Sequence, residues 1–550
     1  MERRQFIRNS AMAGAAFAVS GARGWAKSGD ARIDILLDES QGKISPNLYG
    51  QFTEHIGGVI YDGVWVGERS KIPNRHGIRS ELIDRMKQIH VPIIRWPGGC
   101  FADSYDWKDG IGAPSKRPRR TNFWEVDHDA KRLHEKGPQI FEPNEFGTNE
   151  FARFCRLTEA QPYLAVNLRS LPPLDFDHWV EYCNSPAGST TLAEMRGSAG
   201  FPEPFNVRYW GVGNESWGCG GNFTPEEYAS EFRRYTTWIP SYGLDLQLIG
   251  SGPNDNDIDW THRFFEQIYS GHAYRNRSFT GWSVHHYASD LSRGGARKGD
   301  RKGDALQFEP VDWYELLRQC DLTEQIIHDQ WAAMGQYDTE HRVKLVVDEY
   351  GPWYREGTEL DPTHIFGQQI TVRDALATAL TLDIFNRNSE KVSIATCAQL
   401  INNLNALFLA HEDRFFATPN FHVFAMYAAH QGGEALRTVF SVPDVQYMRD
   451  GKSARFWGLN GSASRKGSVV TLTVVNPDLS KTTDTRIALR GARIIRADGT
   501  VLTADDMHAH NTFDQPDAVT PEDLAVAVRE EQLNVSLPPA SVTKLTVIVG

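Results

Sequence analysis

The chain has 550 residues, of which 40% are hydrophobic and 23% are charged, and its formal net charge is −12 at pH 7. A chain of this length can bury a large core and form two or more domains, since an α/β barrel alone takes about 250 residues. The acidic balance argues against a nucleic-acid-binding protein, because such a protein needs a basic surface to replace the counterions of the phosphates.

The first 30 residues differ from the rest of the chain. Arg3 and Arg4 precede a run of small apolar residues from 11 to 19, which is too short to span a bilayer. A basic start, a short apolar run and small residues are typical of a signal peptide, and the paired arginines indicate the twin-arginine type. We therefore expect residues 1–30 to direct export of the folded protein to the periplasm or the medium, with no membrane contact once the signal is removed. A disordered basic tail is the alternative interpretation.

Residues 45–431 alternate short apolar runs with amphipathic helical patterns. One helical pattern places Leu82, Ile83 and Met86 on a single face, and another begins with a capping box at residues 224–227. Eight runs are predicted as strands: 48–54, 92–96, 163–168, 207–215, 247–250, 282–287, 344–349 and 392–399. Eight strand–helix alternations predict an α/β fold of the (β/α)8 TIM barrel type. A doubly wound sheet would give a similar alternation.

The pattern changes after residue 431. Residues 468–475 and 542–549 alternate as strands do, helical signals are few, and Gly, Pro, Asn and Asp punctuate the segment. We predict that residues 432–550 form a C-terminal all-β sandwich, jelly-roll-like in type. Residues 31–38 also alternate, so the segment 31–44 is expected to add an N-terminal strand to this sandwich. The charged, glycine-rich residues 292–304 predict a solvated loop, with a flap over the site as the alternative.

The six cysteines show neither a CxxC pair nor the spacing of a zinc site. Their even number in an exported chain permits disulfides. Their scatter through a large domain favours buried free thiols. We predict no structural metal and no cofactor.

Two glutamates stand out because each ends a predicted apolar strand. Glu215 follows Asn214 at the end of the fourth strand, and Glu349 follows Asp348 at the end of the seventh. A single strand-end glutamate is commonly a surface or salt-bridged carboxylate. Reactive groups of barrels, however, gather at the carboxyl ends of the strands. Because glycoside hydrolysis needs one protonated and one ionised carboxyl group at the scissile bond, this pair predicts a glycosidase.

Several motifs, in order along the chain, resemble those of glycoside hydrolase family 51, the α-L-arabinofuranosidases. They are LYGQFTEH at 48–55, RWPGGCFAD at 95–103, GNESWGCGG at 213–221, DEYGPWY at 348–354, AQLIN at 398–402, HNTF at 510–513 and LPPASV at 537–542. The resemblance covers nearly everything after residue 30. The segment that follows Glu349 departs from the family pattern, which bears on the loop shape and the leaving-group preference but not on the chemistry.

The resemblance implies a retaining, exo-acting hydrolase that releases terminal L-arabinofuranose from hemicellulose, pectin or their oligosaccharides. It implies that Glu215 is the general acid/base, protonated in the free enzyme, and that Glu349 is the ionised nucleophile. Retention requires the two carboxyl groups to lie about 5–5.5 Å apart. The family also implies a homo-oligomer, often a hexamer.

The same resemblance implies a set of substrate-binding residues: Glu54, Cys100, Asn214, His285, Tyr287, Trp353 and Gln399. Tyr287 is expected to orient the Glu349 carboxylate, and Trp353 to form an aromatic wall, or else to pack. His286 alternates to the other face of its strand and is expected to be structural. His55, His285 and His286 could suggest a metal, but this mechanism needs none.

Two rival functions stay open on the sequence alone. Another retaining barrel glycosidase, such as an endoglucanase or a β-xylosidase, would use the same two glutamates. A non-catalytic carbohydrate-binding protein is expected to lack one of them, and both are present.

Overall fold

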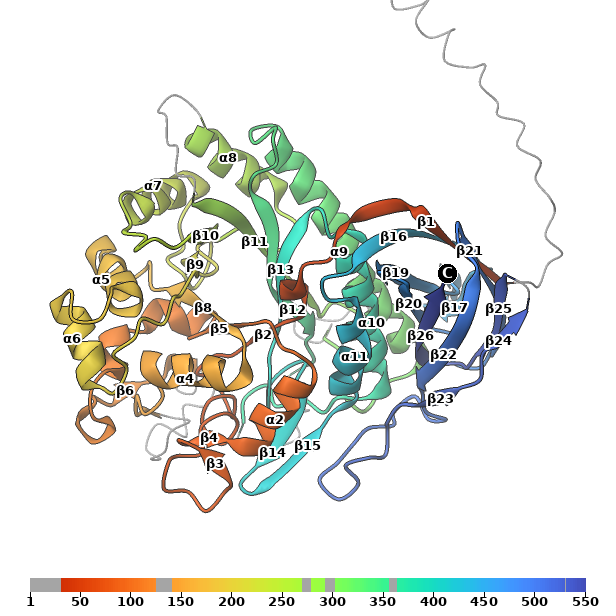
Figure 1. Cartoon of the computed structure of the whole chain (residues 1–550), viewed down its shortest axis with the longest axis horizontal. Helices are drawn as coiled ribbons and strands as arrows, with labels where there is room; N and C mark the ends of the chain where they lie inside the picture. Colours follow the sequence, from red (N-terminus) through yellow and green to blue (C-terminus); the bar gives the residue numbers. More distant parts are fainter. Residues whose placement is uncertain (1–30, 125–140, 270–277, 292–301, 356–363, 530) are drawn as a thin grey trace, which may run out of the picture.

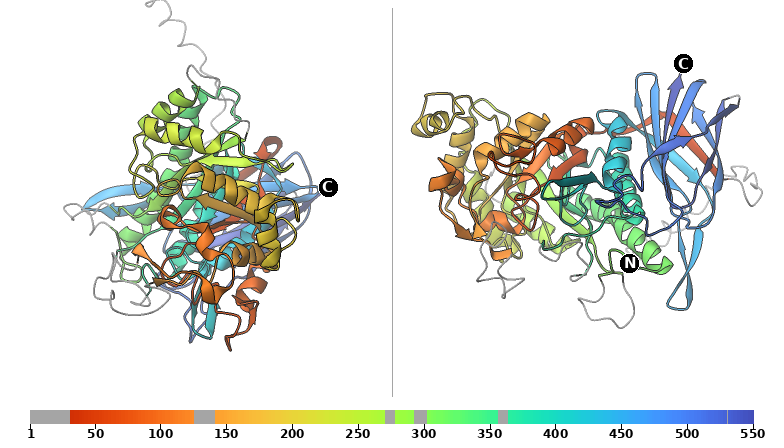
Figure 2. Two further views of the ribbon diagram at one scale, coloured as in Figure 1. Left: turned by 90° about the vertical axis from the view of Figure 1, so that its left-hand side faces the viewer. Right: turned by 90° about the horizontal axis from the view of Figure 1, so that it is seen from below.

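The computed structural model describes residues 31–124, 141–269, 278–291, 302–355, 364–529 and 531–550. A barrel and a β domain lie side by side in it (Figure 1), and the right-hand view of Figure 2 also shows the two as distinct parts. The predicted signal segment and most of the 292–304 loop lie outside the described residues. No helix in the described part of the chain combines the length and the apolar character needed to cross a membrane.

The barrel is closed and parallel, with eight strands in the described part of the chain. The strands are β2 (Gly50–Phe52), β5 (Ile93–Trp96), β8 (Gln161–Val166), β9 (Tyr209–Val212), β10 (Gln247–Gly250), β11 (Phe279–Ala288), β12 (Lys344–Pro352) and β13 (Val392–Cys397). Each pairs with its neighbours in chain order, and β13 pairs with β2 to close the ring. The predicted barrel is therefore confirmed, and the doubly wound sheet is excluded.

Helices surround the barrel strands (Figure 1). They are α2 (Ser80–Gln88), α4 (Thr148–Thr158), α5 (Pro173–Asn184), α6 (Thr191–Ser198), α7 (Pro225–Thr236), α8 (Ile258–Tyr269), α9 (Pro310–Gly335), α10 (Val372–Arg387) and α11 (Pro419–Tyr427). Helix α7 begins at the predicted capping box. The backbone N–H of Glu227 donates to the Thr224 hydroxyl (3.3 Å), and the N–H of Thr224 donates to the Glu227 carboxylate (2.8 Å).

The C-terminal domain is built on one ten-stranded sheet within the described residues. In spatial order its strands are β23 (Glu522–Leu524), β22 (Ile494–Leu502), β26 (Ser541–Val549), β20 (Val469–Asn476), β19 (Asn460–Lys466), β16 (Glu434–Ser441), β1 (Ala31–Lys43), β21 (Thr483–Arg490), β25 (Gln532–Leu537) and β24 (Ala527–Arg529). Strand β1 runs antiparallel to β16 and parallel to β21. Its inward residues Ile33 and Ile35 are fully buried in the core of this domain.

Further hairpins extend from the two units in the described chain. They are β3 (Asn74–Arg75) with β4 (Ile78–Arg79), β6 (Arg120–Thr121) with β7 (Phe141–Glu142), β14 (Phe408–His411) with β15 (Arg414–Ala417), and β17 (Val445–Arg449) with β18 (Lys452–Phe456). The β14–β15 hairpin follows the last barrel strand and packs near the first barrel loop.

Helix α10 joins the barrel to the β domain and is buried along almost its whole length. Its Asp383 carboxylate accepts hydrogen bonds from Ser462 on β19 (2.6 Å), Thr473 on β20 (2.6 Å) and Tyr427 on α11 (2.7 Å). Burial raises the pKa of Asp383 to about 6, although these hydrogen bonds act to lower it. One buried acid thus links two helices of the barrel to two strands of the sheet.

Candidate active site

A narrow pocket of about 50 Å³ lies at the carboxyl ends of the barrel strands. Its lining is Glu54, Ile56, Gly99, Cys100, Trp124, Glu215, Tyr287, Glu349, Trp353, Phe366, Gln399, Asn403 and Leu404. Seven of the nine residues predicted for the site are in this lining. Of the other two, His285 contacts Glu215, and Asn214 directly precedes Glu215 in the chain. A larger hollow of about 1060 Å³ opens elsewhere, and its described lining includes none of the nine.

Glu349 is held as a buried carboxylate on strand β12. Arg95 donates to its Oε1 (2.9 Å) and Tyr287 donates to its Oε2 (2.6 Å). Burial alone would raise the pKa of Glu349. The charges of His285 and Arg95, together with the two hydrogen bonds, outweigh burial and lower that pKa below its ordinary value. Glu349 is therefore ionised at neutral pH, as a nucleophile must be.

Glu215 lies just beyond strand β9. The chain turns there through Gly213 (φ 87°), and Glu215 itself adopts φ 40°, a left-handed conformation that is uncommon for a residue with a side chain. Its Oε2 lies 3.6 Å from the sulfur of Cys100 and 3.6 Å from that of Cys219. Its side chain is 20% exposed, against 8% for Glu349. Glu215 thus occupies the more open side of the site.

His285 on strand β11 lies between the two carboxylates. Its Nδ1 is 3.1 Å from Glu215 Oε1 and 3.6 Å from Glu349 Oε2. Burial would lower the pKa of His285, but the carboxylate of Glu349, followed by that of Glu215, raises it above its ordinary value. Ligand atoms of all three residues lie within 4.8 Å of one another. The structure therefore brings the two predicted glutamates together across a gap that one sugar ring can fill.

Glu54 is a buried carboxylate in the lining of the pocket. Its Oε1 accepts hydrogen bonds from the backbone N–H of Phe101 (2.9 Å) and from the Trp124 indole (2.9 Å), and its Oε2 accepts one from Gln399 (3.2 Å). Burial and the nearby charge of Glu349 raise the pKa of Glu54 to about 7. A Cβ on Gly99 would lie 2.8 Å from Glu349 Oε1, so only glycine leaves room for this carboxylate.

Arg95 connects Glu349 to Asn214 and was not among the predicted site residues. Its second amino group donates to Asn214 Oδ1 (2.7 Å), and its guanidinium lies 3.9 Å from Asp348. The signal that could have found it is its position at the end of strand β5 within RWPGG, where barrel strands present functional groups. Trp124 was also missed, because it lies in a loop whose direction the sequence does not predict.

Tyr287 and Trp353 pack together at the pocket, whereas His286 lies on the other side of its strand. Tyr287 packs edge-on against Trp353 (5.1 Å), and Lys302, at the edge of the described part of the 292–304 loop, lies 3.6 Å above the Trp353 ring. His286 points away from the pocket to Asp255 (2.9 Å) and to the carbonyl of Gln319 (2.8 Å). His286 therefore has the structural position expected of it.

The expectation of free thiols was wrong for one pair of cysteines. Cys100 and Cys219 form a disulfide with Cα atoms 5.6 Å apart, while Cys155, Cys183, Cys320 and Cys397 are buried free thiols. The pair lies 119 residues apart in sequence and meets only because the loops after β5 and β9 converge on the pocket. Scatter along the chain says nothing about such convergence, which is why the sequence interpretation failed here.

Comparison with known proteins agrees with this geometry. Residues 85–293 match the family model described as alpha-L-arabinofuranosidase 1 domain, and residues 348–541 match the alpha-L-arabinofuranosidase C-terminal domain. An intracellular exo-alpha-L-arabinofuranosidase of Bacteroides ovatus is 34% identical over 94% of this chain and 95% of its own length. The chain belongs to the α-L-arabinofuranosidases of glycoside hydrolase family 51.

Two further relatives extend this assignment within the α-L-arabinofuranosidases. The crystal structure of the GH51 arabinofuranosidase from Xanthomonas axonopodis pv. citri is 35% identical, covers 94% of this chain and 99% of that one, and superposes with a TM-score of 0.85. Intracellular exo-alpha-(1->5)-L-arabinofuranosidase 1 of Bacillus subtilis is 26% identical over 93% of this chain and 97% of its own. The chain therefore spans nearly the full length of these family members.

The predicted location of this α-L-arabinofuranosidase was wrong. The relatives from Bacteroides ovatus and Bacillus subtilis are both named intracellular enzymes, which contradicts an exported, periplasmic or secreted protein. The prediction depended on a basic pair and a short run of small residues, a pattern of composition that carries little specific information. Residues 1–30, on which it rested, lie outside the described structure.

Proposed function

We propose that Glu349 is the nucleophile and Glu215 the general acid/base of this retaining, exo-acting α-L-arabinofuranosidase. The observation that carries the proposal is the separation of the two groups, since one oxygen of each lies within 4.8 Å of the other. Retaining glycosidases hold their carboxyl groups about 5–5.5 Å apart, whereas inverting enzymes leave about 6.5–9.5 Å for a water molecule.

In the first step the ionised Glu349 attacks the anomeric carbon, and Glu215 donates its proton to the departing glycosidic oxygen. The Glu349 oxygen then becomes part of an ester, so its negative charge disappears from the site. Tyr287 and Arg95, which bind that charge in the free enzyme, keep the carboxylate oriented for the attack. In the second step Glu215, now ionised, takes a proton from water as the water attacks the same carbon and releases Glu349.

We further propose that Glu54, Asn214 and Gln399 bind the hydroxyl groups of the arabinofuranose ring. The Oε1 atom of Gln399 is buried in the lining and finds no hydrogen-bond donor among the described residues, so a sugar hydroxyl is a suitable donor for it. Trp353 and Tyr287 provide an aromatic wall beside them. Exo action is supported by the relatives from Bacteroides ovatus and Bacillus subtilis, which are both named exo-acting arabinofuranosidases.

The stereochemistry of azide rescue tests the two roles separately. In Glu215→Ala, azide should attack the glycosyl-enzyme from the face that water uses and yield the α-L-arabinofuranosyl azide after two inversions. In Glu349→Ala, azide should replace the nucleophile and yield the β-azide after one inversion. NMR of the products would distinguish them, and the exposed Glu340→Ala provides a control that should keep full activity without azide.

Leaving-group dependence gives a second readout for Glu215. Glu215→Ala should lose far more activity on a poor leaving group such as an arabino-oligosaccharide than on an aryl arabinofuranoside with an acidic phenol. Equal losses on both substrates would contradict the acid role. A panel of linear and branched arabino-oligosaccharides would also identify the preferred linkage.

We also propose that the chain assembles as a homo-oligomer, as its resemblance to the family implies. Light scattering coupled to size-exclusion chromatography measures the molar mass. A mass equal to that of one chain would contradict this proposal.

A further inference from the structure

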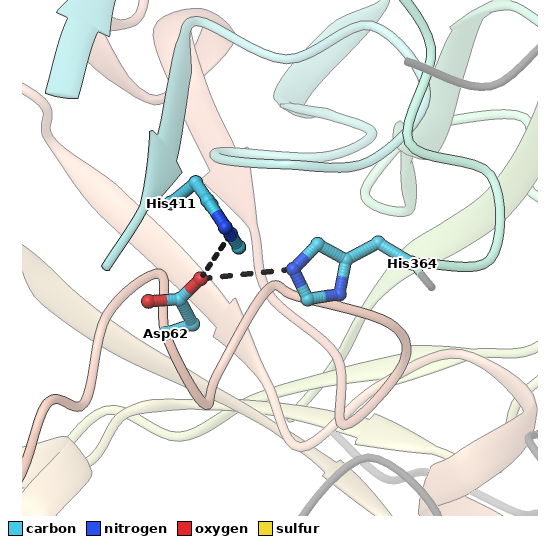
Figure 3. Close-up of side chains that lie close together, drawn as sticks. All are labelled: Asp62, His364 and His411. Carbon is cyan, nitrogen blue, oxygen red and sulfur yellow. Dashed lines mark ion pairs between the residues drawn. The ribbon is translucent and has the colours of Figure 1, made fainter. Parts of the chain in front are cut away.

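A carboxylate and two imidazoles converge outside the lining of the catalytic pocket. Asp62 lies in the loop after β2, His364 precedes α10, and His411 ends strand β14. Figure 3 shows the two rings directed at the same oxygen of Asp62. The His364 Nε2 atom and the His411 Nδ1 atom each lie 3.6 Å from Asp62 Oδ2, and the three ligand atoms all lie within 4.8 Å of one another.

The two 3.6 Å distances are close to the distances between neighbouring ligand atoms of one metal ion. A hydrogen bond between a ring nitrogen and a carboxylate is about 2.7–3.2 Å long, so both 3.6 Å distances exceed it. In a tetrahedral zinc site with bonds of about 2.0–2.2 Å, neighbouring ligand atoms lie roughly 3.3–3.5 Å apart. The two histidine nitrogens lie within 4.8 Å of each other, so an inward shift of the side chains would place all three atoms on one ion.

The carboxylate is oriented by its surroundings. The backbone N–H of Glu412 donates to Asp62 Oδ1 (2.9 Å), which leaves Oδ2 to face the histidines. The Asp62 backbone has φ 73°, a conformation that Asp and Asn tolerate better than other side chains do. Such support of a ligating carboxylate by a second hydrogen bond is typical of built metal sites.

The position of the His364 ring depends on a glycine. A Cβ on Gly58 would lie 3.0 Å from both Cδ2 and Nε2 of His364, so a larger residue at position 58 would displace the ring. Asn402 fixes the same region, because its amide donates to the Gly58 carbonyl (2.9 Å) and accepts from the N–H of Ala410 (2.7 Å). Two of the three ligand-bearing segments are thus held together without an ion.

The positive charge of Arg79 near Asp62 is offset by neighbouring carboxylates, so the local electrostatics permit a cation. Arg79 approaches the other oxygen, Asp62 Oδ1, at 3.7 Å, and it is bound by the carbonyls of Asp62 (2.5 Å) and Glu412 (2.9 Å). Glu81 and Asp413 also act on Arg79 and offset its charge. The side chain of His411 is 52% exposed, so solvent can reach the site and supply a further ligand.

We propose that Asp62, His364 and His411 bind one Zn²⁺ ion, with water completing the coordination. Two imidazoles and one carboxylate are ligands that zinc accepts, and an ion there would bind neutral histidines and an ionised aspartate. Two other groups of metal-type side chains in the described residues contain Glu215 and belong to the active site.

Such an ion would brace the wall of the pocket. The Asp62 loop also carries Ile56, and the segment of His364 carries Phe366 two residues later. The β14–β15 hairpin follows the segment of Asn403 and Leu404. All four of these residues line the catalytic pocket. One ion would therefore connect the three loops that bear them, at a point away from the reacting atoms.

The test uses the full chain after EDTA treatment and dialysis. Zn²⁺ is added in excess, free metal is removed, and bound zinc is measured by mass spectrometry together with the melting temperature. We expect one zinc per chain and a rise of a few degrees in melting temperature, because an ion that binds only the folded state stabilises it.

Asp62→Asn is the decisive variant. Asparagine keeps the size, the acceptor for the Glu412 N–H and the tolerance of a positive φ, but it removes the anionic ligand. Asp62→Asn and His411→Ala should each weaken zinc binding at least about tenfold and abolish the melting-temperature shift. His178→Ala, at a partly exposed position on α5, should behave as the parent does.

Circular dichroism and hydrolysis without zinc should match the parent in Asp62→Asn and His411→Ala, which shows that both fold. A parent chain that binds no zinc would overturn the proposal. Zinc that stays bound in both variants would also overturn it, because the ion would then lie at other residues.

Discussion

At the scale of single residues, the site depends on how Glu349 keeps its charge while buried. Two hydrogen bonds and two neighbouring positive groups offset the cost of burial. The lowered pKa of Glu349 is thus a balance of large opposing contributions, and the removal of one partner should be measurable.

Tyr287→Phe removes one of those partners and keeps the ring that packs on Trp353. Because the hydroxyl lowers the pKa of Glu349, its loss should raise that pKa and move the acid limb of the kcat/KM profile to higher pH. We expect kcat/KM at the optimum to fall by about 10–100-fold, which corresponds to a charge-assisted hydrogen bond. A pH profile whose acid limb does not move would contradict the assigned contact.

Glu54 makes the stability of the protein depend on pH. Its pKa is about 7 in the folded protein against an ordinary value of 4.5, so the folded state binds this proton more tightly than the unfolded state does. The stabilisation is complete below about pH 4.5 and is lost as the pH rises to about 7, with an upper magnitude on the order of 3 kcal/mol. Denaturant unfolding across this range should show the loss, and Glu54→Gln should remove it.

The sequence predicts the acidic members of the site better than their partners. Glu54, Glu215 and Glu349 end apolar runs, and in a barrel that position alone directs them to one face. Arg95 contacts Glu349 from strand β5, and Trp124 contacts Glu54 from a loop. A hydrophobic pattern predicts neither the direction of the arginine side chain nor the path of the loop. The zinc ligands proposed here were missed for the same reason, since Asp62, His364 and His411 come from three distant segments.

At the scale of elements, all eight predicted strands overlap barrel strands. The strand at 247–250 has the predicted ends, and the other seven differ at one or both ends. The fourth was predicted to run to Glu215 and ends at Val212, because Gly213 and Glu215 adopt positive φ and leave the sheet. The first was predicted from residue 48, where a 3-10 helix (Pro46–Tyr49) capped by Ser45 still continues. Turn chemistry therefore overrides the apolar pattern at both places.

The Cys100–Cys219 disulfide holds the turn that carries Glu215 against the loop after β5. Cys219→Ser should lower the free energy of unfolding by about 2–5 kcal/mol, because the closed loop is long. It should also lower kcat for poor leaving groups, since both sulfurs contact the Glu215 carboxylate. Dithiothreitol should reproduce both changes in the parent and add nothing in Cys219→Ser. A parent insensitive to reductant, with a variant that behaves as the parent does, would contradict this role.

At the scale of the whole molecule, the barrel and the β domain share the buried carboxylate of Asp383. Asp383→Ala would leave the hydroxyls of Ser462, Thr473 and Tyr427 without their acceptor. We expect a loss of about 2–4 kcal/mol in the free energy of unfolding, measured by chemical denaturation. The exposed Asp505→Ala is the matched control and should change stability by less than about 0.5 kcal/mol.

Strand β1 has a consequence for how the molecule is made. It occupies the middle of the C-terminal sheet, yet both of its partner strands are synthesised roughly 400 residues later. During translation the apolar face of β1 stays without its partner strands until the whole barrel has been synthesised. Strand β21 leaves the ribosome only near the end of synthesis. A fragment cut between barrel and β domain would divide a single sheet between its two halves. A circular permutant that joins residue 31 to the C-terminal end would deliver β1 together with its partners and should refold faster.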